Sequence, residues 1–222
     1  MLPLGTVDPA QPHVEIRVSG DIDTKSRVVI ILGESTQELG VIAHRVLGGT
    51  GGINKGSMVG LVREIKKQRS SATDPTAPGI ILANPGELFW WPEGRKSLTP
   101  TGRHALPMAS AVHYGRYHEP SKNDIPENRS PAEHVRYILD KVVPAVVPAE
   151  AKIDIISVGI VAEHVEEYLN NDAVWAKLGD ALNSLTVVGS FYNASKIECE
   201  GFRTFMQKVF PPRSRILVSY LY

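Results

Sequence analysis

The chain has 222 residues, of which 42% are hydrophobic, so it can bury the core of one α/β domain. Lys plus Arg and Asp plus Glu number 24 each, and this balance excludes a strong overall field toward nucleic acid or a membrane surface. The single cysteine, Cys199, excludes an internal disulfide and a thiolate zinc site and is typical of a reducing compartment such as the nucleus or cytosol.

The first third of the chain predicts a leader, strands and helices in alternation. Residues 1–12 are rich in proline and predict an irregular leader, which leaves residues 13–222 as the domain. An alternating run at 13–18 and a continuously apolar run predict two strands, which we expect to pair as a hairpin. Apolar residues at helical spacing then predict two helices, before a further buried strand. The second strand falls at residues 27–32, the two helices at 34–47 and 58–68, and the further strand at 79–83.

The rest of the chain predicts more strands and helices after a long irregular segment at 84–129. Helix resumes clearly at Ser130, a capping residue, followed by Pro131 at the first helical position and by Glu133, which can complete a capping box. Further strands are expected at residues 152–158, 184–188 and 216–221, and helices at 161–169 and 201–209. Strands that alternate with helices predict an α/β three-layer sandwich with a mostly parallel sheet.

Residues 153–169 read as a buried strand that turns sharply into an amphipathic helix. In α/β-hydrolases the motif Gly-x-Ser-x-Gly holds the nucleophile at such a turn, but Gly159 occupies the central position here. Ser157 comes two residues too early, and strand alternation predicts that it is buried beside Ile155. The one histidine after it, His164, lies inside the helix. We therefore expect a hydrolase-like body without hydrolase chemistry.

Four other patterns have ordinary explanations. The glycine-rich residues 48–57 match neither a Walker loop nor a dinucleotide fingerprint. Histidines 104, 113 and 118 match no zinc spacing, so we expect no metal and no cofactor. The basic residues of segment 63–69 are explained by a solvated face. Trp90 and Trp91 follow a strand, and we favour sealing of the core over a binding role for them.

Several segments together resemble the fungal Argonaute-binding-protein-two (Arb-two) domain family, which also includes the C-terminal domain of fungal class II histone deacetylases. The resemblance runs from about Val14 to the end of the chain, and its most specific motif is residues 128–135. The residues that carry it are Gly33, Glu34, Gln37, Leu39, Gly40, residues 51–54, Gly56, Ser57, residues 83–86, Trp90, Trp91, residues 104–107 and residues 128–135. Family members continue beyond the position of Tyr222, so we expect a C-terminally truncated domain.

The resemblance implies an α/β-hydrolase-like fold used for protein interaction in small-RNA-directed heterochromatin silencing, in the nucleus or, as an alternative, the cytoplasm. It implies Argonaute or another silencing-complex subunit as the partner. The balanced charge predicts that any contact with RNA is indirect, and because no apolar run approaches about 18 residues we expect no membrane span. The sequence is compatible with a homodimer. Relatives often keep a Ser-containing elbow, where this chain has Gly159 and Val161.

Two hypotheses follow. The first is a non-catalytic interaction domain whose surface includes aromatics of the kind that binding hot spots favour: Asn84, Trp90, Trp91, Arg103, His104 and His118. The alternative is a serine esterase with an unorthodox nucleophile, Ser157 or Ser190, and with His164 or a loop histidine as the base.

Overall fold

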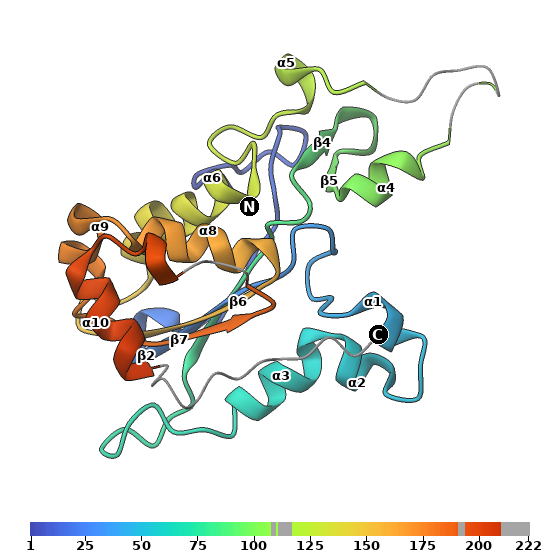
Figure 1. The fold of residues 1–222 in the computed structure, drawn as a ribbon. Helices are drawn as coiled ribbons and strands as arrows, with labels where there is room; N and C mark the ends of the chain where they lie inside the picture. The colour runs from blue at the N-terminus through green and yellow to red at the C-terminus, as the bar shows by residue number, and fades with distance from the viewer. Residues whose placement is uncertain (108–109, 111–116, 191–193, 210–222) are drawn as a thin grey trace.

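A computed structural model describes residues 1–107, 110, 117–190 and 194–209. Its central feature is a twisted five-stranded sheet of order β1-β3-β2-β6-β7 (Figure 1). The pair β1 and β3 is antiparallel, and the other neighbours are parallel. The strands are β1 (Arg17–Val18), β2 (Arg27–Leu32), β3 (Gly79–Ala83), β6 (Lys152–Val158) and β7 (Leu182–Val188).

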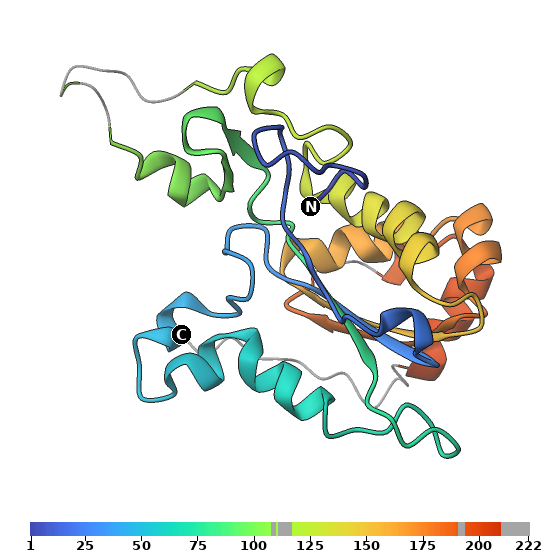
Figure 2. The same ribbon diagram turned by 180° about the vertical axis from the view of Figure 1, so that it is seen from behind.

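Helices cover both faces of this sheet (Figures 1 and 2). One face carries α6 (Pro131–Tyr137), continued by a π-helical turn η3 (Ile138–Val142) and α7 (Val143–Val146), together with α8 (Ile160–Leu169). The other face carries α3 (Met58–Ile65), preceded by α1 (His44–Leu47) and α2 (Gly52–Gly56). The prediction of three α/β layers with a mostly parallel sheet is confirmed.

Two clusters of buried side chains correspond to the two faces. Along β2, Val28 and Ile30 belong to the larger cluster under α6 and α8, whereas Val29 and Ile31 pack with Met58 on the α3 side. Successive side chains of a strand point to opposite faces, so a strand covered on both faces must be apolar throughout. This is why the continuous apolar runs predicted β2, β3 and β6 at the correct residues.

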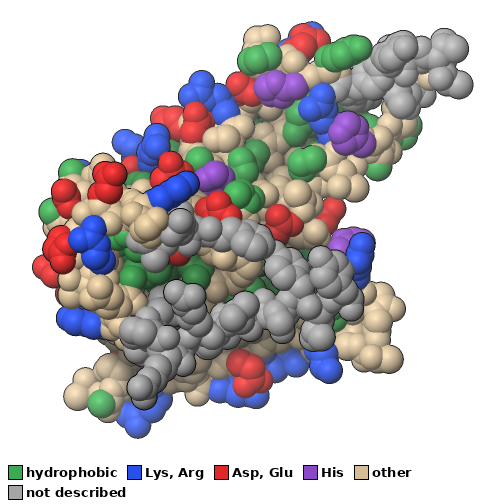
Figure 3. Space-filling view, in the orientation of Figure 1, with side chains coloured by type: hydrophobic (Ala, Val, Ile, Leu, Met, Phe, Trp, Pro, Cys, Tyr) green, Lys and Arg blue, Asp and Glu red, His purple; other side chains and the backbone are tan. Residues whose placement is uncertain are grey.

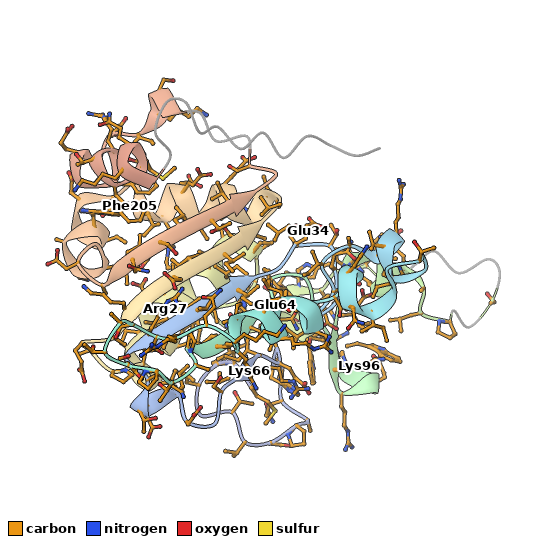
Figure 4. All side chains as sticks on the ribbon, turned by 90° about the horizontal axis from the view of Figure 1, so that it is seen from below. Arg27, Glu34, Glu64, Lys66, Lys96 and Phe205 are labelled. Atoms are coloured by element: carbon orange, nitrogen blue, oxygen red, sulfur yellow. The ribbon has the colours of Figure 1, made fainter. Side chains whose placement is uncertain are left out.

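A polar cluster joins the amino ends of three strands. The buried Asp154 of β6 accepts hydrogen bonds from Arg27 Nε of β2 (2.5 Å) and from Asn183 (2.7 Å) and Ser184 (2.6 Å) of β7. Arg27, labelled in Figure 4, also donates to the carbonyl of Arg69 in the linker after α3. Burying a carboxylate is costly unless it is paired and hydrogen-bonded, and here it is both.

The chain closes the larger core with α9 (Asp172–Leu178), a short η4 (Ala194–Lys196) and α10 (Glu200–Val209). The Trp175 ring of α9 lies 5.6 Å from that of Phe202 and 5.5 Å from that of Phe205, which Figure 4 labels. The strand β7 begins two residues before its predicted start, and α10 one residue before. The strand predicted at 216–221 lies outside the described residues.

Two expectations for the N-terminal third are wrong. The first strand does not pair with β2 as a hairpin but with β3, through Arg17↔Leu82 and Val18↔Ile81. Both edges of β2 are occupied, by β3 and β6, and β1 pairs instead with the other edge of β3. After η1 (Ile22–Thr24) and β2, the helix expected at 34–47 shrinks to α1, because Gly40 adopts φ +89. A residue in that conformation interrupts a right-handed helix.

Residues 1–12 contain no regular helix, yet their first residues are packed into the domain. Leu2 is fully buried in the larger core and forms a bridge with Val14. The Leu4 N–H donates to the Tyr137 hydroxyl of α6 at 2.8 Å. The leader therefore packs against the side of the domain that carries α6 and α8.

The segment 84–129 contains more structure than expected. A small antiparallel pair, β4 (Phe89–Trp91) and β5 (Lys96–Leu98), is joined by η2 (Pro92–Gly94) and followed by α4 (Pro100–His104) and α5 (Pro120–Asn123). These pieces are too short for a sustained periodicity.

The predicted helix start at Ser130 is confirmed, since its Oγ accepts from the Glu133 N–H. The Glu133 carboxylate reaches back to the N–H of Arg129 and not to that of Ser130. The capping box therefore forms one residue further out than expected.

Candidate functional site

The carboxyl ends of the parallel strands meet at one edge of the sheet, where open α/β sheets bind ligands. Glu34 follows β2 at this edge, and Figure 4 labels it. Asn84 follows β3, Gly159 follows β6, and Ser190 lies just after β7. These are the positions from which a hydrolase would build its catalytic machinery.

Gly159 occupies a sharp elbow between β6 and α8, with φ +63 and ψ −139. Its N–H donates to the carbonyl of Val188 in β7 at 2.8 Å, which fixes the turn against the neighbouring strand. A Cβ added at Gly159 would lie 2.9 Å from Glu34 Cγ. Glu34 therefore occupies the space that a side chain at position 159 would need. The positive φ of this position would also strain any residue other than glycine.

Within the described part of the chain, the alternative nucleophiles are not brought together with His164. Ser157 is fully buried, as predicted, and its Oγ has no hydrogen-bond partner among the described residues. Ser190 Oγ donates to the carboxylate of Glu166 on α8, and burial raises the pKa of that carboxyl. Within the described part of the chain His164 pairs with Glu167, at 3.9 Å, and with neither serine.

A buried histidine, His134, connects α6 to the end of β3. Its Nε2 accepts from the Asn84 N–H at 3.1 Å, so Nδ1 carries the ring proton and donates to Asn128 Oδ1 at 2.8 Å. His134 and Asn128 are both fully buried, and burial lowers the pKa of His134 to about 3. The imidazole is thus held neutral and acts as a structural connector.

The Asn84 side chain is also used within the protein. Its Oδ1 accepts from the Glu87 N–H (3.2 Å), and its Nδ2 donates to the Glu87 carboxylate (2.9 Å). The same carboxylate accepts from the Leu39 N–H (3.0 Å). Asn84 is buried, so it supports the loops at this edge without presenting its own surface.

A pocket of ≈ 230 Å³, which we call the carboxyl-edge pocket, opens among these loops. It collects Arg103, His104 and His118 of the predicted interaction surface, while Asn84, Trp90 and Trp91 do not line it. In Figure 3, histidine and basic side chains lie among hydrophobic ones at the end of the molecule that carries β4, β5 and α4. The lining consists of Ser35, Pro85, Gly86, Leu88, Phe89, Leu98, Pro100, Arg103, His104, His118, Arg129 and Pro131.

The two tryptophans have different environments. Trp90 is 1% exposed and belongs to the larger core, with its ring centroid 4.8 Å from that of His13. Trp91, on the opposite face of β4, is partly exposed, and Lys96 Nζ lies 5.7 Å from its ring. Trp90 therefore seals the core, which is the role favoured for it from the sequence.

Three basic side chains of the pocket contact specific neighbours. The Arg103 guanidinium lies 4.7 Å from the Phe89 ring centroid, a cation–π geometry. His118 Nε2 is 2.7 Å from Asp124 Oδ1. Arg129 forms a two-pronged pair with Glu133, and this hydrogen bonding lowers the pKa of the Glu133 carboxyl.

The sequence did not identify most of the lining residues. The sequence predicts no role in the site for Phe89, and it marks Arg129 and Pro131 only through the helix start and the family motif. Leu98 and Pro100 gave no signal, because they come from the short hairpin and helix that periodicity missed.

Within the described ranges, no three His, Cys, Asp or Glu side chains are grouped so that they could hold a metal ion. The expected set of His104, His113 and His118 cannot be assessed as a whole, because His113 lies outside those ranges. A search of the same ranges found no helix that is both long enough and apolar enough to cross a membrane.

Comparison with known proteins gives one match. A family model described as the Arb2 domain matches residues 1–210. No curated protein and no solved structure matches the chain. Because the family match covers nearly all of the chain, the protein belongs to the Arb2 domain family.

Proposed function

We propose that this protein is a non-catalytic interaction domain that binds Argonaute or another protein subunit of a small-RNA-directed heterochromatin silencing complex. Family membership supports the silencing context, and the carboxyl edge of the sheet supports the non-catalytic role. In this proposal RNA reaches the domain only through its protein partner, and the domain acts in the nucleus.

The observation that carries the non-catalytic role is the elbow. Gly159 stands where a hydrolase has its nucleophile, and Glu34 occupies the space beside it. Covalent catalysis needs a nucleophile within hydrogen-bond reach of a base, and that base must in turn be oriented by a third group. Ser157 has no partner among the described residues, and His164 pairs with Glu167.

The pocket supports a protein partner better than a cofactor. Its ≈ 230 Å³ is smaller than the roughly 300–1,000 Å³ of pockets that enclose drug-sized ligands. Arg103, His104, His118 and Arg129 are among its polar residues, whereas Trp90 and Asn84 are buried and do not line it. Arginine side chains are enriched at binding hot spots.

Two measurements test the proposal. The purified chain should co-purify with a recombinant Argonaute or silencing-complex subunit, and it should remain unlabelled by a fluorophosphonate probe. Failure to bind any subunit of the complex would contradict the interaction role. A steep salt dependence of RNA affinity for the purified chain alone would contradict indirect RNA contact.

The alternative function, a serine esterase, rests on the hydrogen bond between Ser190 and the Glu166 carboxylate. A carboxylate that accepts a hydrogen bond from a serine hydroxyl can act as a base for that serine, although more weakly than a histidine. Fluorophosphonate labelling of the wild-type chain that disappears in Ser190→Ala would establish this alternative and overturn the non-catalytic role. Labelling that persists in Ser190→Ala would point to another serine, of which Ser157→Ala is the first to test.

A further inference from the structure

We infer that the helical layer formed by α1, α2 and α3 binds an acidic segment of a protein partner that carries an aliphatic side chain. We call residues 41–70, which contain these helices, the α1–α3 surface. No residue of it lines the carboxyl-edge pocket, so the inference goes beyond the proposed function and names a second interaction surface. It depends on the charge of this surface, on its exposed aliphatic side chains, and on the packing that holds them together.

The α1–α3 surface is positive within a chain that is electrically balanced. It contains six Lys and Arg residues and a single acid, Glu64, whereas the whole chain has 24 of each kind. All six basic residues are exposed, and Figure 3 shows Lys and Arg side chains on both sides of an acidic one along the lower edge of the molecule, where Figure 1 places α3. The sequence explains the basic residues of segment 63–69 by a solvated face, but the fold adds two more from α1 and α2. The six are Arg45, Lys55, Arg63, Lys66, Lys67 and Arg69.

Most of this charge is not neutralised by acidic side chains of the described chain. Lys67 pairs with Glu64 at 2.7 Å, and it is the only basic residue of the α1–α3 surface that forms an ion pair with a described residue. Lys66 lies near Asp21, but Asp21 itself is paired with Lys25 at 2.8 Å. A surface with this excess of positive charge attracts a partner of opposite charge.

Exposed aliphatic side chains lie among these basic residues. Ile53 is 66% exposed, Val59 48% and Val46 38%, and they are three of the nine exposed large hydrophobic side chains of the described residues. Val59 shares one stripe of α3 and its C-cap with Arg63 and Lys66, because helix positions three and four residues apart face the same way. An aliphatic group exposed beside a basic one suits a ligand that carries both an aliphatic side chain and a carboxylate.

A close approach between α2 and α3 holds these side chains together. A Cβ added to Gly60 of α3 would lie 2.1 Å from the carbonyl oxygen of Asn54, so only glycine lets the end of α2 approach α3 there. Asn54 Oδ1 also accepts a hydrogen bond from Arg63 at 3.2 Å. These contacts bring Ile53 and Lys55, the neighbours of Asn54 in the chain, next to the exposed stripe of α3. A preformed surface lowers the cost of ordering it on binding.

The same features disfavour nucleic acid and a membrane. Residues 41–70 contain no Phe, Tyr or Trp, so the surface offers no aromatic ring of these types on which bases could stack. A helix that lies on a membrane inserts its apolar face, but the apolar face of α3 is buried in the smaller core cluster with Val29 and Ile31. The positive charge therefore fits a carboxylate-bearing protein segment better than a phosphate backbone or a lipid surface.

Fluorescence anisotropy with labelled probes tests the inference. The probes are a peptide in which Leu alternates with Asp and Glu, a version with Asn and Gln in place of the acids, a version with Ser in place of Leu, and an RNA oligonucleotide. We expect the acidic Leu peptide to bind at least about tenfold more tightly than either control peptide, and its affinity to fall as salt is raised. Equal affinity of the three peptides, no binding of any, or tighter binding of the RNA than of the acidic Leu peptide would overturn the inference.

Variants of the chain locate the binding to the α1–α3 surface. The double variant Lys55→Glu, Lys66→Glu should weaken binding of the acidic Leu peptide by at least about tenfold. Ile53→Ser should weaken it by about threefold or more but leave binding of the Ser version unchanged, because that version has no aliphatic side chain to place there. The matched control is Lys141→Glu, Lys177→Glu, which reverses two exposed charges on η3 and α9. An equal loss in this control, or unchanged binding in the first double variant, overturns the inference.

The two proposals fail differently. Peptide binding that is insensitive to charge reversal on the α1–α3 surface overturns this inference and leaves the proposed function in place. Peptide binding with the expected pattern, in a chain that captures no silencing-complex subunit, supports this inference and contradicts the proposed function.

Discussion

Gly159 is the residue whose environment restricts the chemistry of the domain most. Its φ of +63 is rarely adopted by residues with a side chain, and such backbone conformations cost of order 1–3 kcal/mol. The neighbouring Glu34 Cγ would lie 2.9 Å from an added Cβ, closer than real Cβ atoms approach. The two effects are separable, because Glu34 can move aside whereas the backbone of the elbow is held by Val188.

Gly159→Ser should lower the free energy of unfolding by about 1–3 kcal/mol, and it should not create labelling by a fluorophosphonate probe. Urea denaturation of Gly159→Ser, Glu34→Ala and the double variant forms a cycle that separates crowding from backbone strain. The double variant should recover only the crowding part. Full stability of Gly159→Ser alone would show that the elbow tolerates a side chain and would contradict the strain assigned to its backbone.

At the scale of elements, the junction between α6 and the end of β3 depends on a buried hydrogen-bond chain. Asn84 donates its N–H to His134, and His134 donates to Asn128. Because the ring is fully buried, protonation would place an uncompensated charge in the core, which is why the pKa of His134 falls to about 3. The carboxyl edge is therefore anchored by a group that must stay neutral.

This anchor predicts a pH dependence of stability. The pKa of His134 is lower in the folded chain than the unfolded value of about 6.5, so only the unfolded chain takes up the proton as pH falls below 6.5. Its contribution to stability is complete above pH 6.5 and is lost toward pH 3, by about 1.4 kcal/mol per pH unit. Urea denaturation of wild type at a series of pH values should show this loss.

His134→Gln supplies the comparison, since Gln keeps a donor and an acceptor but does not titrate. It should be less stable than wild type near neutral pH, and the difference should narrow as pH falls, while contributions from acids such as Glu133 and Glu166 cancel. The same substitution at exposed His44 controls for the loss of a histidine elsewhere. A difference that stays constant with pH would contradict the assignment.

Elements whose burial is decided locally were predictable, and those decided by distant partners were not. The runs that became β2, β3 and β6 are apolar because both faces of each strand are covered, and this information is contained in the run itself. The partner of β1 depends on which strand of the sheet has a free edge. The alternation of apolar and polar residues predicts a strand but not the strand with which it pairs. The helix expected at 34–47 failed because Gly40 and the turn from Glu34 to Gln37 override its apolar spacing.

The candidate site divides in the same way. The missing nucleophile could be read from the sequence, because the elbow lies between adjacent elements. The pocket could not, since its lining comes from segments near Ser35, Phe89, Leu98, His118 and Arg129 that meet only in the folded chain. Trp90 and Trp91 alternate across β4, but which of them is buried depends on the distant His13.

For the whole molecule, one large cluster of buried side chains extends from Leu2 in the first residues to Phe202 in α10. The first residues are therefore part of the same cooperative unit as the sheet, although they have no regular structure of their own. Two contacts hold them, the bridge between Leu2 and Val14 and the hydrogen bond from Leu4 to Tyr137. Damage to the leader should thus destabilise the whole domain and not only its own segment.

The pair Leu2→Ala and Val7→Ala tests this, since both truncate apolar side chains of the same segment. Leu2 is fully buried, and its truncation should leave a cavity and cost about 2–5 kcal/mol of the free energy of unfolding. Val7 is 86% exposed, and its truncation should change stability by no more than about 0.5 kcal/mol. Urea denaturation followed by tryptophan fluorescence reports on the distant core, because Trp90 and Trp175 both pack in or against the larger cluster. If Leu2→Ala unfolds at the same urea midpoint as wild type, the first residues do not contribute to the stability of the core, and the prediction is wrong.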